Sequence, residues 1–356
     1  PDLQKPMSAR TCLKRLLFKP LLRLAKRLNR SGARDYLNLR HGVARLDRWL
    51  GREPTDVHRT TWELSQCTAT WFDLPQSQSQ SHRERVILYL HGGGFIFETP
   101  RMHGDLLARL CRAVAARGLM LNYRLAPEHP YPAATDDCLE AYRGLLDQGY
   151  AAQNIVIGGD SAGGNLTLVT LLRIRAAGLP LPAGAIALSP FTDALGASDS
   201  FARNARHDAM LTPHTYALVM DNYLPDTARR GEPWISPLRG DLEGLPPIFI
   251  MVGSGEMLLD DAVRFANRCP SATLEVWHGM PHVFPAIAFL PEARRALQRM
   301  TEVLRTLYAS PVDDAPSLDA VLHPPQGEML LAPSATSHYA LAWGVLALLT
   351  LAVLLV

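Results

Sequence analysis

The chain has 356 residues, of which 47% are hydrophobic and 20% are charged, with 25 glycines, 27 prolines and five cysteines. This composition excludes wholesale disorder, a collagen-like repeat and a small disulfide-rich scaffold. No two cysteines form a CxxC pair, so we expect buried thiols in a reducing compartment and no structural zinc site.

The formal net charge of +2 is unevenly distributed, because the first 50 residues hold 13 Lys and Arg against three Asp. Leucines recur there at helical spacing, at Leu13, Leu17, Leu21, Leu24 and Leu28, with Pro20 starting or interrupting the helix. This pattern predicts either a basic amphipathic helix on an anionic membrane surface or a helix packed on its own domain, and both can hold at once. No nucleic-acid-binding motif accompanies the charges, so we expect no nucleic acid partner.

The middle of the chain alternates short apolar runs with helical stretches. Strands are predicted at Arg85–Leu90, Leu119–Tyr123, Asn154–Ile157, Ala185–Leu188, Pro247–Val252 and Thr273–Trp277. Helices are predicted at His103–Ala116, Ala133–Leu146, Asn165–Ala177, Asp260–Arg268 and Pro291–Tyr308. This alternation predicts an α/β fold whose mostly parallel sheet is covered by helices on both faces.

The interval from Pro190 to Leu245 is too long for a simple crossover between two strands. It contains a helical stretch of its own, about Thr212–Tyr223, and we interpret it as an insertion above the carboxyl edge of the sheet. One domain is then predicted to span residues 61–308, with the insertion at about 190–245, and a basic N-terminal helical segment at 1–60 precedes it.

A glycine-rich loop, His91-Gly92-Gly93-Gly94, directly follows the first predicted strand. Consecutive glycines let backbone amides approach a ligand, and such amides stabilise the oxyanion that forms when an ester carbonyl is attacked. A phosphate-binding loop is the competing interpretation. The loop lacks the GK[ST] ending and the GxGxxG spacing, so we favour the oxyanion role.

A GxSxG sequence, Gly159 to Gly163, lies between a predicted strand and a predicted helix. That context forces a sharp turn that exposes the hydroxyl of Ser161, as a nucleophile requires. The helix N-terminus also places its positive dipole end beneath the hydroxyl.

An acid and a histidine follow the last two predicted strands. Their order along the chain after Ser161 is the order nucleophile, acid, histidine that is expected in this class of fold. The acid is predicted to be Glu256, with Asp260 as a rival that falls in the following helix. The base is predicted to be His282, with His278 as a rival four residues away.

The C-terminus combines a linker with an uncharged segment. Residues 309–338 hold five prolines and little periodicity, whereas residues 339–356 carry no charge over 18 residues. A helix of that length is about 27 Å long, near the thickness of the hydrocarbon core of a bilayer. We therefore predict a transmembrane anchor, with a buried core helix as the alternative. Without an apparent secretory signal, and with a basic N-terminal segment, the catalytic domain is expected on the cytoplasmic side.

Together, HGGG, YRLAPE (residues 123–128) and GDSAGGN (residues 159–165) resemble the hormone-sensitive-lipase family of α/β-hydrolases. The stretches SPLRGDLEGLPP (236–247) and GSGEMLLDDA (253–262) are similar to it too, so the resemblance covers about residues 60–308. It implies a serine esterase whose active site is covered by a cap, formed by the N-terminal segment 1–60 and by the insertion at about 190–245 (the cap insertion). It also implies an oxyanion hole formed by Gly93, Gly94 and Ala162.

The family more often has Asp where Glu256 stands, although related members carry Glu and the fold accepts either acid. The family's histidine is followed two residues later by Phe or Trp, so Phe284 favours His282. The resemblance also implies that His91 organises the glycine loop and does not carry a proton in the reaction. We interpret Asp160 as a hydrogen-bonding anchor of the elbow, and Glu128 and Asp136 as structural.

These residues predict a carboxylic ester hydrolase of short to medium acyl esters that works through an acyl-enzyme, with no metal and no cofactor. Hydrolysis of an amide, lactone or membrane lipid by the same fold stays open, as does a noncatalytic ligand-binding role, because a fold alone does not establish activity. An intact Ser, acid and His argue against the noncatalytic role.

Overall fold

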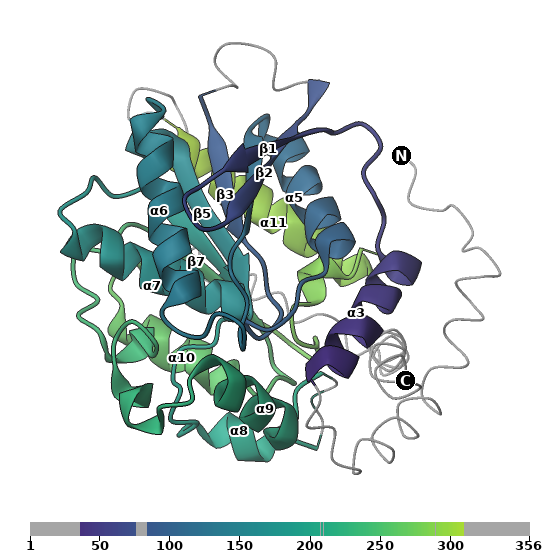
Figure 1. Cartoon of the computed structure of the whole chain (residues 1–356), viewed down its shortest axis with the longest axis vertical. Coiled ribbons are helices and arrows are strands. Elements are labelled where there is room, and N and C mark those ends of the chain that lie inside the picture. The colour runs from purple at the N-terminus through teal and green to yellow at the C-terminus, as the bar shows by residue number, and fades with distance from the viewer. Residues whose placement is uncertain (1–35, 76–83, 207, 209, 289, 310–356) are drawn as a thin grey trace, which may run out of the picture.

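The computed structural model describes residues 36–75, 84–206, 208, 210–288 and 290–309 (Figure 1). Its centre is an eight-stranded sheet with the strand order β1-β2-β4-β3-β5-β6-β7-β8. The strands are β1 (His58–Glu63), β2 (Thr68–Asp73), β3 (Val86–Leu90), β4 (Arg117–Asn122), β5 (Ile155–Asp160), β6 (Gly184–Leu188), β7 (Ile248–Gly253) and β8 (Ala272–Trp277). The neighbours in the series β4-β3-β5-β6-β7-β8 are parallel, whereas β2 is antiparallel to both of its neighbours, β1 and β4.

Helices cover both faces of the sheet. One face carries α5 (Pro100–Val114) and α11 (Pro291–Tyr308), and the other carries α6 (Ala133–Asp147), α7 (Ala162–Ala176) and α10 (Leu259–Arg268) (Figure 1). The short 3-10 turns are η2 (Ala152–Asn154), η3 (Thr227–Gly231), η4 (Pro237–Arg239) and η5 (Phe284–Ala286). The predicted α/β fold is thus confirmed, and each predicted strand and helix is present with ends shifted by up to three residues.

The antiparallel pair β1 and β2 was not among the predicted strands. Strand β1 is an edge strand of mostly exposed polar residues, so it lacks the apolar run that marks the central strands. Trp62 of β1 stacks on Trp71 of β2, with ring centroids 6.3 Å apart, and this cross-strand pair supplies part of the apolar contact.

Two segments lie near the carboxyl edge of the sheet. The interval after β6 contains α8 (Asp199–Arg203) and α9 (Pro213–Tyr223), where the predicted helix begins one residue late because Thr212 serves as its N-cap. At the N-terminal end, α3 (Tyr36–Leu50) is tied to the loop after β4 by a bidentate pair between Arg40 and Glu128, at 2.6 and 2.7 Å.

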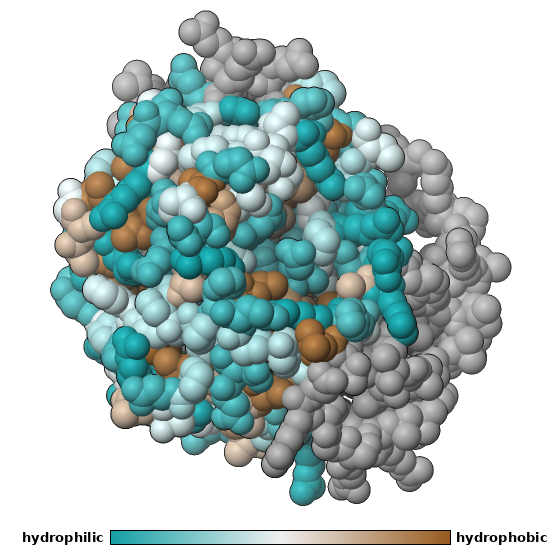
Figure 2. Space-filling model, viewed as in Figure 1, coloured by the Kyte–Doolittle hydropathy of each residue, from teal (hydrophilic) through white to brown (hydrophobic). Residues whose placement is uncertain are grey.

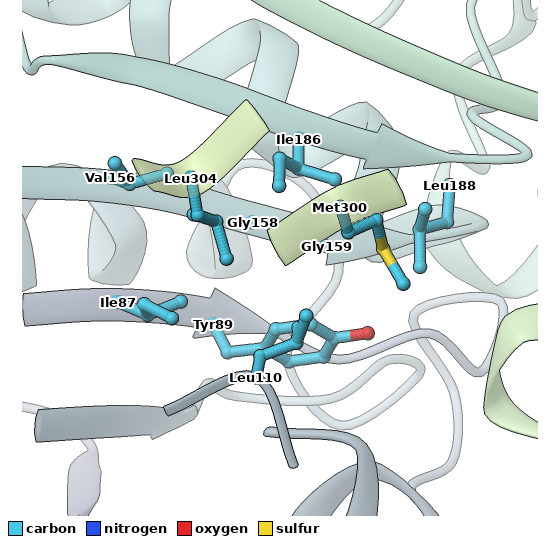
Figure 3. Close-up of a pocket in the computed structure, with 10 residues that line it drawn as sticks. All are labelled: Ile87, Tyr89, Leu110, Val156, Gly158, Gly159, Ile186, Leu188, Met300 and Leu304. Atoms are coloured by element: carbon cyan, nitrogen blue, oxygen red, sulfur yellow. The ribbon is translucent and has the colours of Figure 1, made fainter. Parts of the chain in front are cut away.

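The core between the sheet and the α5–α11 layer is close-packed. Figure 3 shows a small space there, lined by Ile87, Tyr89, Leu110, Val156, Gly158, Gly159, Ile186, Leu188, Met300 and Leu304. Its volume of about 10 Å³ holds at most about one water molecule. This space is part of the folding core and cannot admit a substrate.

The predicted linker and anchor, residues 309–338 and 339–356, lie outside the described residues apart from Ala309, and so do the first 35 residues. In the part of the chain that is described, no helix has the length and apolarity needed to span a membrane. Of the cysteines described, Cys111, Cys138 and Cys269 are buried, Cys67 is half-buried, and all four are free thiols.

Candidate active site

Ser161 stands at a sharp turn between β5 and α7. Its backbone has φ 53° and ψ −116°, a strained conformation for a non-glycine residue. Its flanking glycines are required by close packing: a Cβ on Gly159 would lie 2.4 Å from the carbonyl oxygen of Gly163, and a Cβ on Gly163 would lie 1.9 Å from that of Leu90. The turn can therefore form only with glycine on both sides of the serine.

The structure brings the three predicted catalytic side chains together. The Nε2 of His282 lies 2.8 Å from the Oγ of Ser161, and its Nδ1 lies 2.7 Å from the Oε2 of Glu256. His282 and Glu256 are almost completely buried, at 2% and 0% exposed. This is the hydrogen-bonded sequence of nucleophile, base and acid that acyl transfer requires.

Burial and charge act against each other in this buried pair. Burial disfavours the imidazolium, but the adjacent Glu256 carboxylate outweighs that effect and leaves the pKa of His282 above its ordinary value. Burial also raises the pKa of the Glu256 carboxyl, an effect that the neighbouring His282 opposes. The pair is therefore arranged to stabilise the imidazolium that forms when the serine loses its proton.

The two rival residues lie elsewhere. Asp260, in the first turn of α10, accepts from the backbone N–H of Ser200 at 2.7 Å and pairs with Arg203. His278 is exposed on the turn after β8. The geometry thus joins Glu256 and His282, and neither rival, to the serine.

Ser189, which was not among the predicted site residues, binds both Glu256 and the residue after His282. It follows β6, and its hydroxyl donates to Glu256 Oε1 at 2.8 Å and accepts from the backbone N–H of Val283 at 3.1 Å. The N–H of Gly253 donates to the same carboxylate oxygen at 2.5 Å. Its position could have indicated a role in the site, because Ser189 is a polar residue at the carboxyl end of a parallel strand, and such ends form the ligand-binding edge of the sheet.

The glycine loop lies directly against the elbow. Strands β3 and β5 are neighbours, with Leu90 paired to Gly159, so the loop after β3 and the turn after β5 emerge side by side. Gly93 and Gly94 have φ of 124° and 59°, values that favour glycine. The structure thereby places two of the predicted oxyanion residues on a loop next to the elbow that carries the third, Ala162.

Asp160 anchors the glycine loop to the elbow. Its carboxylate accepts from the N–H of Gly92 at 3.0 Å and from the hydroxyl of Tyr89 at 2.8 Å, and it pairs with His103 Nε2 at 3.2 Å. Burial would raise the pKa of the Asp160 carboxyl, but His103 and these donors outweigh it and hold that pKa below its ordinary value. The hydrogen-bonding role predicted for Asp160 is confirmed, and its carboxylate joins the elbow to the glycine loop, to β3 and to α5.

His91 organises the glycine loop and is held neutral. Its ring stacks on Tyr123 with centroids 4.2 Å apart, and its Nδ1 lies 2.7 Å from the carbonyl oxygen of Gly92. Burial lowers the pKa of His91 to about 4.

The structural role predicted for Glu128 is confirmed, since it pairs with Arg40 at 2.6 Å. Asp136 instead pairs with Arg173 of α7 at 2.7 Å. The carboxylate that binds the YRLAPE loop is its neighbour Asp137, which accepts from the backbone N–H of Arg124 at 2.8 Å.

The chain matches known proteins over this same region. A family model described as the alpha/beta hydrolase fold matches residues 87–286. An acetyl-hydrolase of Streptomyces hygroscopicus is 38% identical over 262 residues, which are 72% of this chain and 84% of that protein.

Solved structures agree with this match. An esterase of the bacterial hormone-sensitive lipase family superposes with a TM-score of 0.75 at 33% identity, covering 85% of this chain and all of that one. The esterase EstE5, in a crystal soaked with p-nitrophenyl butyrate, superposes with a TM-score of 0.72 at 36% identity, over 82% of this chain and 99% of that one. With the serine, histidine and acid brought together as described above, these matches establish that the chain belongs to the hormone-sensitive-lipase family of α/β-hydrolases and is a serine carboxylesterase.

Proposed function

We propose that Ser161 is the nucleophile, His282 the general base and Glu256 the acid of an esterase that prefers short to medium acyl esters. The observation that carries this assignment is the unbroken pair of hydrogen bonds from Ser161 through His282 to Glu256. In the first half of the reaction His282 takes the proton of Ser161 as its oxygen attacks the ester carbonyl. Glu256 holds the Nδ1–H tautomer and stabilises the imidazolium.

Acylation is completed when His282 gives its proton to the departing alcohol, which leaves an acyl group on Ser161. In the second half of the reaction a water molecule loses a proton to His282 and attacks the acyl carbonyl. His282 then returns that proton to the Oγ of Ser161 as the acid leaves, which regenerates the enzyme. In both halves the backbone N–H groups of Gly93, Gly94 and Ala162 are proposed to receive the oxyanion, a contribution worth about 2.7–4 kcal/mol for each donor.

The preference for shorter acyl chains is supported by the cap insertion. Helix α9 packs down on the glycine loop so closely that a Cβ on Gly94 would lie 2.6 Å from Cγ2 of Val219. The half-buried apolar side chain of Val219 therefore lies beside the proposed oxyanion hole and narrows the space for an acyl chain there. Two similar proteins agree with this preference. One is named an acetyl-hydrolase, and the crystal of the other was soaked with p-nitrophenyl butyrate, an ester of a short acyl group.

Hydrolysis of p-nitrophenyl esters of rising acyl length tests the proposal, with wild-type chain and Ser161→Ala compared in detergent. We expect a maximum at short or medium chains and a loss of about six orders of magnitude in kcat in the variant at an unchanged Tm. Wild-type turnover by the variant would disprove the assignment of the nucleophile. A folded wild-type chain without turnover on any ester would favour a narrower substrate or a ligand-binding role.

We also propose that residues 339–356 anchor the enzyme in a membrane through the linker 309–338, with the catalytic domain 61–308 on the cytoplasmic side. Support comes from the 18 uncharged residues and from the basic N-terminal segment. The face of the described body in Figure 2 is mainly hydrophilic with scattered hydrophobic residues, so that face offers no broad apolar surface for a bilayer.

Membrane fractionation of the full chain tests the anchor. We expect alkaline carbonate to leave the wild type in the pellet and to release the full-length double variant Leu346→Arg, Leu349→Arg, because arginine is costly at the centre of a bilayer. Retention of both proteins would contradict the anchor. Protease digestion of sealed vesicles would show on which side the catalytic domain lies.

A further inference from the structure

Two buried side chains of the cap insertion hold the peptide group that follows Glu256. The Nδ2 of Asn204 donates to the carbonyl oxygen of Glu256 at 2.8 Å. The Oδ2 of Asp208 accepts from the N–H of Met257 at 2.7 Å. The carbonyl of Glu256 and the N–H of Met257 belong to one planar peptide group, so both of its polar ends are bound by the insertion.

These two side chains are themselves firmly placed. The Oδ1 of Asp208 accepts from the backbone N–H groups of Met210 and Leu211, each at 2.9 Å, and its own N–H donates to the carbonyl of Asn204 at 2.7 Å. Asp208 is 1% exposed and Asn204 is 9% exposed. In so buried a place each polar atom needs its partner, because an unmatched donor or acceptor costs about 1–3 kcal/mol.

The neighbouring backbone is bound to the same segment. The hydroxyl of Ser200, in α8, donates to the carbonyl of Met257 at 2.7 Å and accepts from the N–H of Asp260 at 2.9 Å. The turn from β7 to α10 is therefore bound at three points of the insertion, Ser200, Asn204 and Asp208. Since a peptide plane can rotate only with its flanking dihedral angles, holding this plane restrains the direction in which the Glu256 side chain leaves the backbone.

We infer that Asn204 and Asp208 are positioning residues that hold the catalytic acid toward His282, so that the cap insertion helps to set the geometry of the catalytic hydrogen bonds as well as covering the site. This inference rests on the proposed role of Glu256. Neither residue needs to touch the substrate. Their loss should therefore lower kcat and leave KM nearly unchanged.

Asp208 has a second effect because it carries charge. Three carboxylates favour the imidazolium of His282 by their charge: Glu256, which contacts it, and more weakly Asp208 from the insertion and Asp160 at the end of β5. Asn204 is uncharged. Removing the charge of Asp208 should lower the pKa of His282 and shift the acidic limb of kcat/KM to lower pH, whereas replacing Asn204 should leave that limb in place.

The experiment compares Asp208→Asn, Asn204→Ala and the control Asp221→Asn in the full chain, with p-nitrophenyl butyrate as substrate and Tm as the measure of folding. Asp221 is an exposed carboxylate on α9 of the same insertion. We expect kcat to fall by roughly 10- to 100-fold in the first two variants with KM within about twofold of wild type. The acidic limb should move only in Asp208→Asn, and the control should match wild type.

Glu256→Gln, measured in parallel, separates two kinds of failure. If it loses activity while Asp208→Asn and Asn204→Ala keep wild-type kcat and pH profiles, the triad stands and the positioning role is disproved. If Glu256→Gln keeps activity, the acid itself is misassigned and the inference falls with it. Should Asp208→Asn not fold, Asn204→Ala decides: a lowered Tm with unchanged kcat would show a purely structural role and overturn the inference.

Discussion

The Oε2 of Glu256 lies 2.7 Å from the Nδ1 of His282, and the other oxygen of the same carboxylate accepts from Ser189 and from the backbone N–H of Gly253. Both oxygens are thus occupied in a fully buried place. A carboxylate held in this way can orient an imidazole through one oxygen without turning to solvent. Its position, more than its identity as Glu or Asp, is what the base requires.

Replacing Glu256 with Gln should lower kcat by about 10⁴-fold while the protein stays folded, because an amide can present its N–H to His282 and favour the wrong tautomer. Steady-state hydrolysis of p-nitrophenyl butyrate measures this effect. Asp260→Asn is the matched control, since Asp260 pairs with Ser200 and Arg203 and lies away from the histidine. Equal losses in the two variants would contradict the assignment of Glu256.

Esterase activity should rise with pH through a midpoint above the ordinary histidine pKa of about 6.5. The base works only when neutral, and the Glu256 carboxylate holds the pKa of His282 above its usual value despite burial. The test is kcat/KM measured from about pH 5 to about pH 10, corrected for spontaneous hydrolysis. An acidic limb well below that ordinary pKa would show that the carboxylate does not stabilise the imidazolium.

Gly163→Ala should destabilise the fold by about 1–3 kcal/mol or more, because its Cβ would lie 1.9 Å from the carbonyl oxygen of Leu90. Gly231→Ala is the matched control. Nothing lies within 4 Å of a Cβ there and the backbone is not left-handed, so a change within about 0.5 kcal/mol is expected. Thermal unfolding of both variants checks the contrast, and similar Tm values for the two would refute the close packing of the elbow.

The buried pair of His103 and Asp160 should make stability depend on pH. Asp160 outweighs burial and raises the pKa of His103, so the stabilisation from that histidine is present below its ordinary pKa and is lost as pH rises through the raised value. The depressed pKa of Asp160 adds stability above its own ordinary value, which is lost at lower pH. The pair therefore stabilises most between about pH 4 and about pH 6.5.

The difference in Tm between wild type and His103→Gln measures this dependence. Because both proteins contain His282, its contribution cancels in the difference. We expect the advantage of the wild type to be larger near pH 6 than near pH 9, where His103 loses its charge. An advantage that grows with pH would contradict a protonated His103.

Elements with a strong local pattern could be predicted from the sequence. The central strands are continuous apolar runs because both of their faces are buried, and the long amphipathic helix Pro291–Tyr308 has the bounds that the periodicity predicted. The edge strand β1 could not be found in this way. Its residues are largely exposed, so its place in the sheet depends on pairing with β2 and leaves no apolar signal.

The same division holds in the site. Ser161 and the glycines around it could be assigned from the sequence, because the sharp turn restricts which residues can occupy adjacent positions. The sequence also favoured Glu256 over Asp260, because Asp260 was expected in the helix that follows. The structure agrees: Asp260 lies in α10 and binds Ser200, whereas the carboxylate of Glu256 lies 2.7 Å from His282.

The fold class, the proposed nucleophile and the glycine loop could be predicted from local patterns, because each involves residues that are close along the chain. How the acid is held could not be predicted in this way. His282 and Ser161 are 121 residues apart, and Asp208 reaches Met257 across 49 residues. Such bonds exist only where parallel strands end side by side and the insertion packs across them, which is a property of the folded chain that no local pattern records.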